Sequence, residues 1–139
     1  MKTGTESPKR WMIVDDDADI LLMLADLAAG LTTAKVDCFR SPREALTAFT
    51  AAPEQFQFII TDLEMPGMNG IEFCRCLRAV SPAVKVLLST GSRALTGAEA
   101  LQKGFCGLLY KPFPLAAIEN ALMSAGVLTS SGNFPAASS

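Results

Sequence analysis

Short apolar runs alternate with longer segments of helical periodicity along most of the chain, and this alternation limits the fold more than any other feature. The apolar runs that suit strands lie at 11–14, 34–39, 56–61, 85–89 and 107–110. Strands that alternate with helices form βαβ units, and consecutive βαβ units build a parallel sheet. The sequence therefore predicts an α/β fold with five parallel strands, each followed by a helix.

Helix signals fill the intervals between these strands. The clearest is at Ser41, where Pro42 and Glu44 fit the first positions of a helix that begins with a capping box. A helix is expected after the first strand, with Ile20, Leu24 and Leu27 facing inward and an end at Gly30. Another is expected from near Gly70 to before Pro82, with Cys74 in the core. The last two are expected over 97–103 and from Pro114.

The chain has the size and composition of one globular domain. Its 139 residues are 50% hydrophobic and 19% charged, which is ordinary for a folded protein. Both ends are rich in small and polar residues. We therefore expect flexible tails at 1–9 and 129–139 around a folded domain at 10–128.

Composition also disfavours several classes of function. The formal net charge of −2 provides no positive field for nucleic acid, and no apolar run reaches the roughly 20 residues of a membrane span. The start of the chain does not resemble a signal peptide, so a cytoplasmic location is expected. The chain has no histidine, which removes His-based catalysis and His metal sites. Its four cysteines form no CxxC pair and are expected to be reduced.

Polar residues follow four of the five predicted strands. Asp15 and Asp16 follow the first strand, Asp62 the third, Thr90 the fourth and Lys111 the fifth. Ligand sites in open α/β sheets form beyond the carboxyl ends of the strands, and neighbouring strands lie roughly 4.8 Å apart. We therefore expect the three carboxylates to lie close together at one edge of the sheet.

Each of these residues alone has a structural explanation, because an acidic run before a helix more often caps it and an Asp before a turn is usually solvated. Their joint placement favours a site. Three close carboxylates stay ionised only beside a cation, and an oxygen-rich cluster without His or Cys suits Mg²⁺ or Mn²⁺. Together with the ammonium of Lys111 and the hydroxyl of Thr90, a cation bound by these carboxylates would provide the groups that phosphoryl transfer to a carboxylate requires.

Four segments carry a family resemblance: IVDDDADI, IITDLEMPGMNGIEF, VLLSTG and GLLYKPF. In this order and spacing they resemble receiver domains of two-component response regulators, over nearly the whole chain. The resemblance implies a doubly wound, flavodoxin-like fold with strand order 2-1-3-4-5. It also implies a partner, either a sensor histidine kinase or a histidine phosphotransfer protein, and output through contact with a downstream protein target.

The resemblance further implies a role for each residue of the metal site. Asp62 would be the phosphoacceptor, which attacks the phosphorus of the partner's phosphohistidine. Asp15 and Asp16 would hold Mg²⁺ together with Asp62, and the backbone carbonyl of Glu64 would be a further ligand.

The remaining site residues would act on the phosphoryl group. Thr90 would hydrogen-bond a phosphoryl oxygen, Lys111 would pair with it, and Gly91 would leave room and offer its backbone amide. Pro112 matches a proline that a cis peptide bond usually precedes.

The chain departs from the family pattern at two positions. The family often carries an aromatic residue three positions before the lysine, where this chain has Leu108. Tyr110 shares the strand face of Leu108 by alternation but is not assumed to replace the aromatic residue. Phe105 is also bulkier than the expected small residue.

The GLLYKPF segment is similar to receivers attached to hybrid histidine kinases.

Two alternatives from other classes stay open. One is a pseudo-receiver, which keeps the fold as a binding module without phosphoryl chemistry. The other is a small α/β phosphatase that works through an aspartyl phosphate, in which Glu64 would occupy the place of the acid/base residue.

Overall fold

A parallel sheet forms the centre of the molecule in the computed structural model, which describes residues 9–111 and 115–124. Within these residues the sheet has five strands in the order β2-β1-β3-β4-β5. The strands are β1 (Arg10–Val14), β2 (Lys35–Phe39), β3 (Phe56–Asp62), β4 (Lys85–Thr90) and β5 (Gly107–Tyr110). The predicted fold class and strand order are confirmed.

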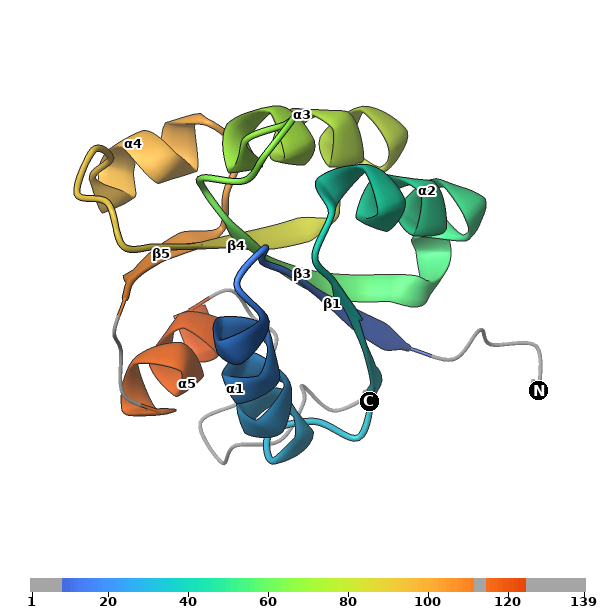
Figure 1. Cartoon of the computed structure of the whole chain (residues 1–139), viewed down its shortest axis with the longest axis horizontal. Coiled ribbons are helices and arrows are strands. Elements are labelled where there is room, and N and C mark those ends of the chain that lie inside the picture. Colours follow the sequence, from blue (N-terminus) through green and yellow to red (C-terminus); the bar gives the residue numbers. More distant parts are fainter. Residues whose placement is uncertain (1–8, 112–114, 125–139) are drawn as a thin grey trace.

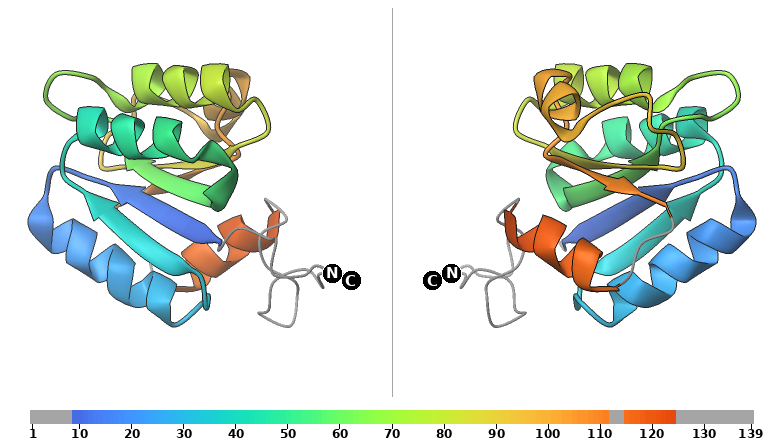
Figure 2. Two further views of the ribbon diagram at one scale, coloured as in Figure 1. Left: turned by 90° about the vertical axis from the view of Figure 1, so that its right-hand side faces the viewer. Right: turned by 90° about the vertical axis from the view of Figure 1, so that its left-hand side faces the viewer.

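Helices cover both faces of the sheet. They are α1 (Ala18–Ala29), α2 (Pro42–Ala51), α3 (Gly70–Val80), α4 (Gly97–Gln102) and α5 (Leu115–Ser124), with a short 3-10 helix η1 (Pro53–Gln55) before β3. Figure 1 shows α2, α3 and α4 on one face and α1 and α5 on the other, and the side views in Figure 2 show the sheet between the two layers. The fold is therefore doubly wound, as predicted.

The two faces of the sheet carry separate hydrophobic cores. Along β1, Met12 and Val14 pack with residues of α2, α3 and α4, whereas Trp11 and Ile13 pack with residues of α1 and α5. This alternation explains why the strands are apolar throughout, because both faces of a parallel sheet are buried. Cys74 lies in the first core as predicted, and the bulk of Phe105 fills space in the same core. All four cysteines are free.

Local hydrogen bonds fix where the helices begin. The Ser41 hydroxyl accepts a bond from the Glu44 N–H, which is one half of the predicted capping box. Both halves are present at the starts of α3 and α4, where the pairs are Asn69 with Glu72 and Thr96 with Glu99. These caps satisfy amides that have no partner within the helix.

Two strands run one residue further than the apolar runs indicate. β3 includes Asp62 and β4 includes Thr90, because Asp62 pairs with Ser89 and Thr90 pairs with Tyr110 in the sheet. The positions of these two site residues are thus held by the sheet itself. The predicted tails (apart from residue 9), the domain end at residue 128, Pro112 and Pro114 lie outside the described residues.

The described helices are short relative to a bilayer. None of those in 9–111 and 115–124 is both long and apolar enough to cross a membrane.

Candidate functional site

Three carboxylates meet at the carboxyl edge of the sheet. Asp15 directly follows β1 and is buried, Asp16 is the next residue, and Asp62 ends β3. One carboxylate oxygen of each residue lies within 4.8 Å of the others. Because β1 and β3 are neighbours in the sheet, their ends carry these side chains to one place. The structure thus brings together the three carboxylates that the sequence places at this edge.

Lys111 reaches the same cluster from the far side of β4. Its backbone N–H donates to the Thr90 carbonyl at 2.8 Å, which continues the pairing of β4 with β5. Its Nζ lies 2.7 Å from Asp15 Oδ2 and 3.4 Å from Asp62 Oδ1. The ammonium therefore bridges two of the three carboxylates.

The electrostatics of the cluster favour a divalent cation. Three carboxylates and one ammonium leave a formal charge of −2. Burial raises the pKa of the Asp62 carboxyl; the Lys111 charge opposes this effect and the Asp15 charge adds to it. Burial alone would lower the pKa of Lys111, but its hydrogen bond to Asp15 and the charges of both carboxylates outweigh burial, so the pKa of the ammonium is raised.

The donor atoms fit the cation that the resemblance implies. All are carboxylate oxygens, and Mg²⁺ and Mn²⁺ prefer oxygen ligands. The Asp62 side chain is 12% exposed and Asp16 is half-buried, so a hydrated ion can approach from solvent. Glu64 is exposed in the loop between β3 and α3, two residues beyond Asp62.

Thr90 and Gly91 lie beside the carboxylates at the end of β4. The Thr90 side chain is buried, and its hydroxyl oxygen accepts a bond from the Ser92 N–H at 3.0 Å. Because that bond uses a lone pair, the hydroxyl hydrogen stays available to a ligand. Gly91 is exposed and nothing lies within 4 Å of the position of a Cβ, so the space beside it is open.

Two residues that the sequence analysis missed also shape the site. Arg40 follows β2, and its guanidinium donates from Nε and Nη2 to the main-chain oxygen of Asp16 at 3.3 and 3.1 Å. At the start of α3, a Cβ on Gly70 would lie 2.3 Å from the main-chain oxygen of Asp62, so only glycine fits there. Arg40 could have been predicted at this edge, because it directly follows β2, and β2 is parallel to β1 and ends at the same edge of the sheet.

The departure at Leu108 has a structural counterpart. Leu108 is half-buried and packs against the core beneath α2, α3 and α4. Tyr110 instead carries an aromatic ring to the loop between β4 and α4, where its hydroxyl donates to the Leu95 carbonyl.

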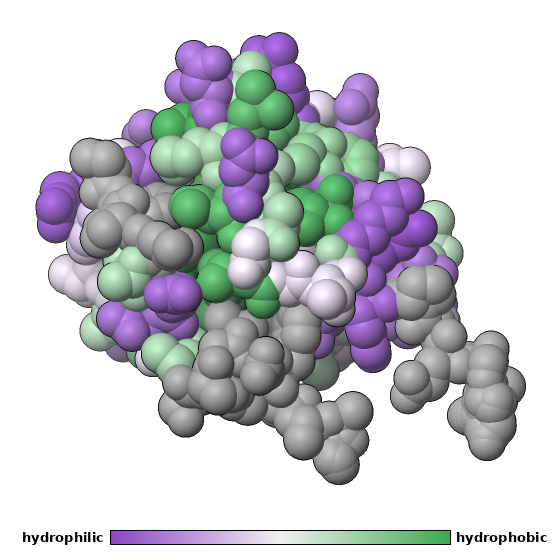
Figure 3. Space-filling view, turned by 90° about the horizontal axis from the view of Figure 1, so that it is seen from below, coloured by the Kyte–Doolittle hydropathy of each residue, from purple (hydrophilic) through white to green (hydrophobic). Residues whose placement is uncertain are grey.

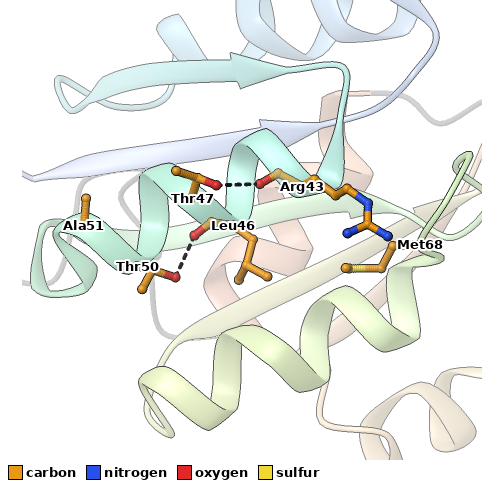
Figure 4. Close-up of a pocket in the computed structure, with 6 residues that line it drawn as sticks. All are labelled: Arg43, Leu46, Thr47, Thr50, Ala51 and Met68. Atoms are coloured by element: carbon orange, nitrogen blue, oxygen red, sulfur yellow. Dashed lines mark hydrogen bonds between the residues drawn. The ribbon is translucent and has the colours of Figure 1, made fainter.

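A groove elsewhere on the surface is separate from this site. It has a volume of about 560 Å³ and is lined by Arg43, Leu46, Thr47, Thr50, Ala51 and Met68. Figure 4 shows that both threonine hydroxyls are bonded to carbonyls of α2 rather than turned into the groove. None of the predicted site residues lines it, and its polar groups do not converge on one point.

The fold and the cluster define a class of protein, and comparison with known families agrees. A family model described as the response regulator receiver domain matches residues 11–123. The chain belongs to this family, the receiver domains of two-component response regulators.

Individual relatives share about a third of the sequence. The chain is 33% identical over 108 residues to the DNA-binding response regulator MtrA of Mycobacterium tuberculosis, covering 76% of this chain and 45% of MtrA. It is 33% identical over 117 residues to the transcriptional regulatory protein PrrA of the same species, covering 84% of this chain and 48% of PrrA. The chain thus spans about half the length of these relatives.

Solved structures show the same fold. A response regulator receiver domain protein from Clostridium thermocellum superposes with a TM-score of 0.76 at 25% identity, covering 84% of this chain and 93% of that one. The chemotaxis response regulator CheY4 of Vibrio cholerae superposes with a TM-score of 0.73 at 26% identity, covering 86% and 99%.

Proposed function

We propose that this receiver domain accepts a phosphoryl group from a phosphohistidine of a partner protein onto Asp62, in a reaction that depends on Mg²⁺ or Mn²⁺. The observation that carries the proposal is the cluster of Asp15, Asp16 and Asp62, with Lys111 bridging two of its members. A cluster with a residual charge of −2 attracts a divalent cation, which would offset the repulsion of an incoming phosphate.

Asp62 is the nucleophile in this proposal. It ends β3, its Oδ1 accepts a bond from the Leu63 N–H at 2.8 Å, and this bond holds the carboxylate in place. A carboxylate oxygen attacks the phosphorus, an O–P bond forms, and the P–N bond to the donor imidazole breaks. The electron pair of that bond returns to the imidazole, which takes up a proton from solvent.

The remaining residues stabilise charge on the transferring group. Asp15, Asp16, Asp62 and the Glu64 carbonyl would hold the metal ion, which when bound screens the carboxylate from the approaching phosphate. Lys111 supplies a positive charge, and Thr90 donates its hydroxyl hydrogen to a phosphoryl oxygen. A Cβ on Gly91 would have nothing within 4 Å, so there is room for the phosphoryl group beside it, and its backbone amide would donate in the same way.

These 139 residues contain no histidine, so the donor phosphohistidine of this proposal lies outside them. We propose a sensor histidine kinase or a histidine phosphotransfer protein in the cytoplasm. Leu22 and Met23 of α1 are exposed, and α1 begins directly beyond the acidic run. Figure 3 views the α1 and α5 side and shows apolar residues gathered on this face, which supports docking of a protein partner there.

Output is proposed to pass through contact with a downstream protein. MtrA is described as DNA-binding, but the chain aligns with less than half of it. The formal charge of −2 gives this chain no positive field for nucleic acid. DNA binding is therefore not part of the function proposed for this chain.

Intact mass spectrometry after incubation with acetyl phosphate tests the proposal. We expect one added phosphoryl group in the presence of Mg²⁺, and none with EDTA or in Asp62→Asn. Absence of labelling in the folded wild type would instead favour a pseudo-receiver. Continuous release of phosphate from small phosphate esters would favour a phosphatase.

A further inference from the structure

Tyr110 joins β5 to the loop that follows Thr90. Its hydroxyl donates to the main-chain carbonyl of Leu95, and its ring lies beneath the guanidinium of Arg93, whose Cζ is 4.1 Å from the ring centroid. A cation over a tyrosine ring is attracted by the negative face of the ring. Two independent contacts therefore hold this loop against the end of β5.

Hydrogen bonds connect the same loop to the site threonine. The Ser92 N–H donates to Thr90 Oγ1 at 3.0 Å, and the Ala94 N–H donates to Ser92 Oγ at 3.1 Å. The next residue is Leu95, whose carbonyl accepts from Tyr110, and Thr96 then caps α4. A continuous path thus runs from the site, through the loop, to the start of α4.

Tyr110 is also tied to the site through the sheet. It pairs with Thr90 in the ladder between β4 and β5, and its chain neighbour is Lys111. Leu109 packs into the core beneath α1 and α5, whereas Leu108 packs on the α4 side. By alternation Tyr110 shares the α4 side with Leu108, as its contact with Leu95 requires.

We propose that Tyr110, together with Arg93, is the positioning element that transmits the state of Asp62 to α4 in this chain. The inference rests on the proposed function, because it needs a phosphoryl group or its analogue at Asp62. When Thr90 donates to that group, Ser92 follows through its bond to Thr90. The far end of the loop is held by Tyr110, so the displacement is passed to Thr96 and α4.

NMR spectroscopy of the amides with beryllofluoride and Mg²⁺, a phosphoryl analogue that needs no kinase, tests this inference. Wild type is expected to bind the analogue and to shift amides of both the loop and α4. Tyr110→Phe removes only the hydroxyl and keeps the ring. We expect it to bind the analogue within about threefold of wild type while its α4 shifts fall by at least about half.

Arg93→Ala provides a second test, because Arg93 is exposed and its loss does not open the core. We expect it also to weaken the α4 response, whereas Arg75→Ala, which removes an exposed arginine from α3, should behave as wild type. A full α4 response in both Tyr110→Phe and Arg93→Ala would overturn the inference and leave the proposed function intact. A wild type that does not bind the analogue would overturn the proposed function itself, and this inference with it.

Discussion

Removing the charge of Asp62 is expected to stabilise the metal-free protein. Asp62→Asn keeps the oxygen that accepts from the Leu63 N–H, so it changes the charge and little else. Asp62 shares the site with Asp15 and Asp16, and each carboxylate repels the others. The change in the free energy of unfolding on substitution therefore measures the net repulsion that Asp62 experiences in the absence of a cation.

The size of the effect follows from the distances. At the limit of 4.8 Å each oxygen pair repels by about 3.5 kcal/mol at an effective dielectric constant of about 20, so two neighbours cost Asp62 about 7 kcal/mol. Attraction to Lys111 at 3.4 Å offsets about 5 kcal/mol. The difference is about 2 kcal/mol, which solvent screening at the partly exposed Asp16 reduces to about 1 kcal/mol. For a domain of this size that raises the Tm by about 3–6 °C.

Thermal and urea unfolding in EDTA give the measurement. Because the folded pKa of Asp62 is raised, the wild-type penalty is absent below the unfolded pKa of about 4, develops as pH rises through the folded pKa, and is complete above it. The gain from Asp62→Asn should therefore appear at neutral pH and vanish in acid. Asp26→Asn removes an exposed charge from α1 and serves as the control.

Adding Mg²⁺ should reverse the order of stability. At tenfold its dissociation constant the ion stabilises wild type by about 1.4 kcal/mol, and it should stabilise Asp62→Asn less because a ligand is lost. An Asp62→Asn protein that is less stable than wild type in EDTA at neutral pH would refute the electrostatic reasoning.

Three other substitutions test separate parts of the site. Lys111→Met leaves the buried Asp15 without its cation and should lower the free energy of unfolding by about 2–4 kcal/mol in urea titrations; a loss within error of zero would contradict the bridging role. Gly70→Ala should cost about 2–3 kcal/mol because its Cβ would meet the main-chain oxygen at the end of β3, whereas Gly97→Ala, with open space around it, should be nearly neutral by the same measurement. Arg40→Ala should weaken Mg²⁺ binding by about threefold to tenfold in calorimetry, and an unchanged affinity would show that its contact next to the cluster does not matter.

Apolar runs were sufficient to predict a parallel sheet and to place its acidic residues at one edge. Strands buried on both faces stand out as short apolar runs, and parallel strands must end at the same edge. For that reason the sequence alone assigns Asp15, Asp16 and Asp62 to one edge of the sheet. The strand order required more, because it came from the family resemblance rather than from periodicity.

The contacts that periodicity could not predict are those made by side chains and loops. The path of the chain after Thr90 decides whether Tyr110 meets Arg93 and Leu95, and no spacing rule describes that path. The caps of α3 and α4 are different, because Asn69 and Thr96 each have a glutamate three residues later, which is a readable signal. At Ser41 the sequence predicts a complete capping box, and the structure shows only the bond from the Glu44 N–H to the Ser41 hydroxyl.

Identification of the phosphorylated carboxylate tests the central claim most directly. Borohydride reduces an acyl phosphate to an alcohol, so an aspartyl phosphate becomes homoserine, which peptide mass spectrometry can locate. After labelling with acetyl phosphate and Mg²⁺, we predict homoserine at position 62 alone. Homoserine at position 15 or 16, or no reduction product in a protein that carries the label, would contradict the assignment of Asp62 as the phosphoacceptor.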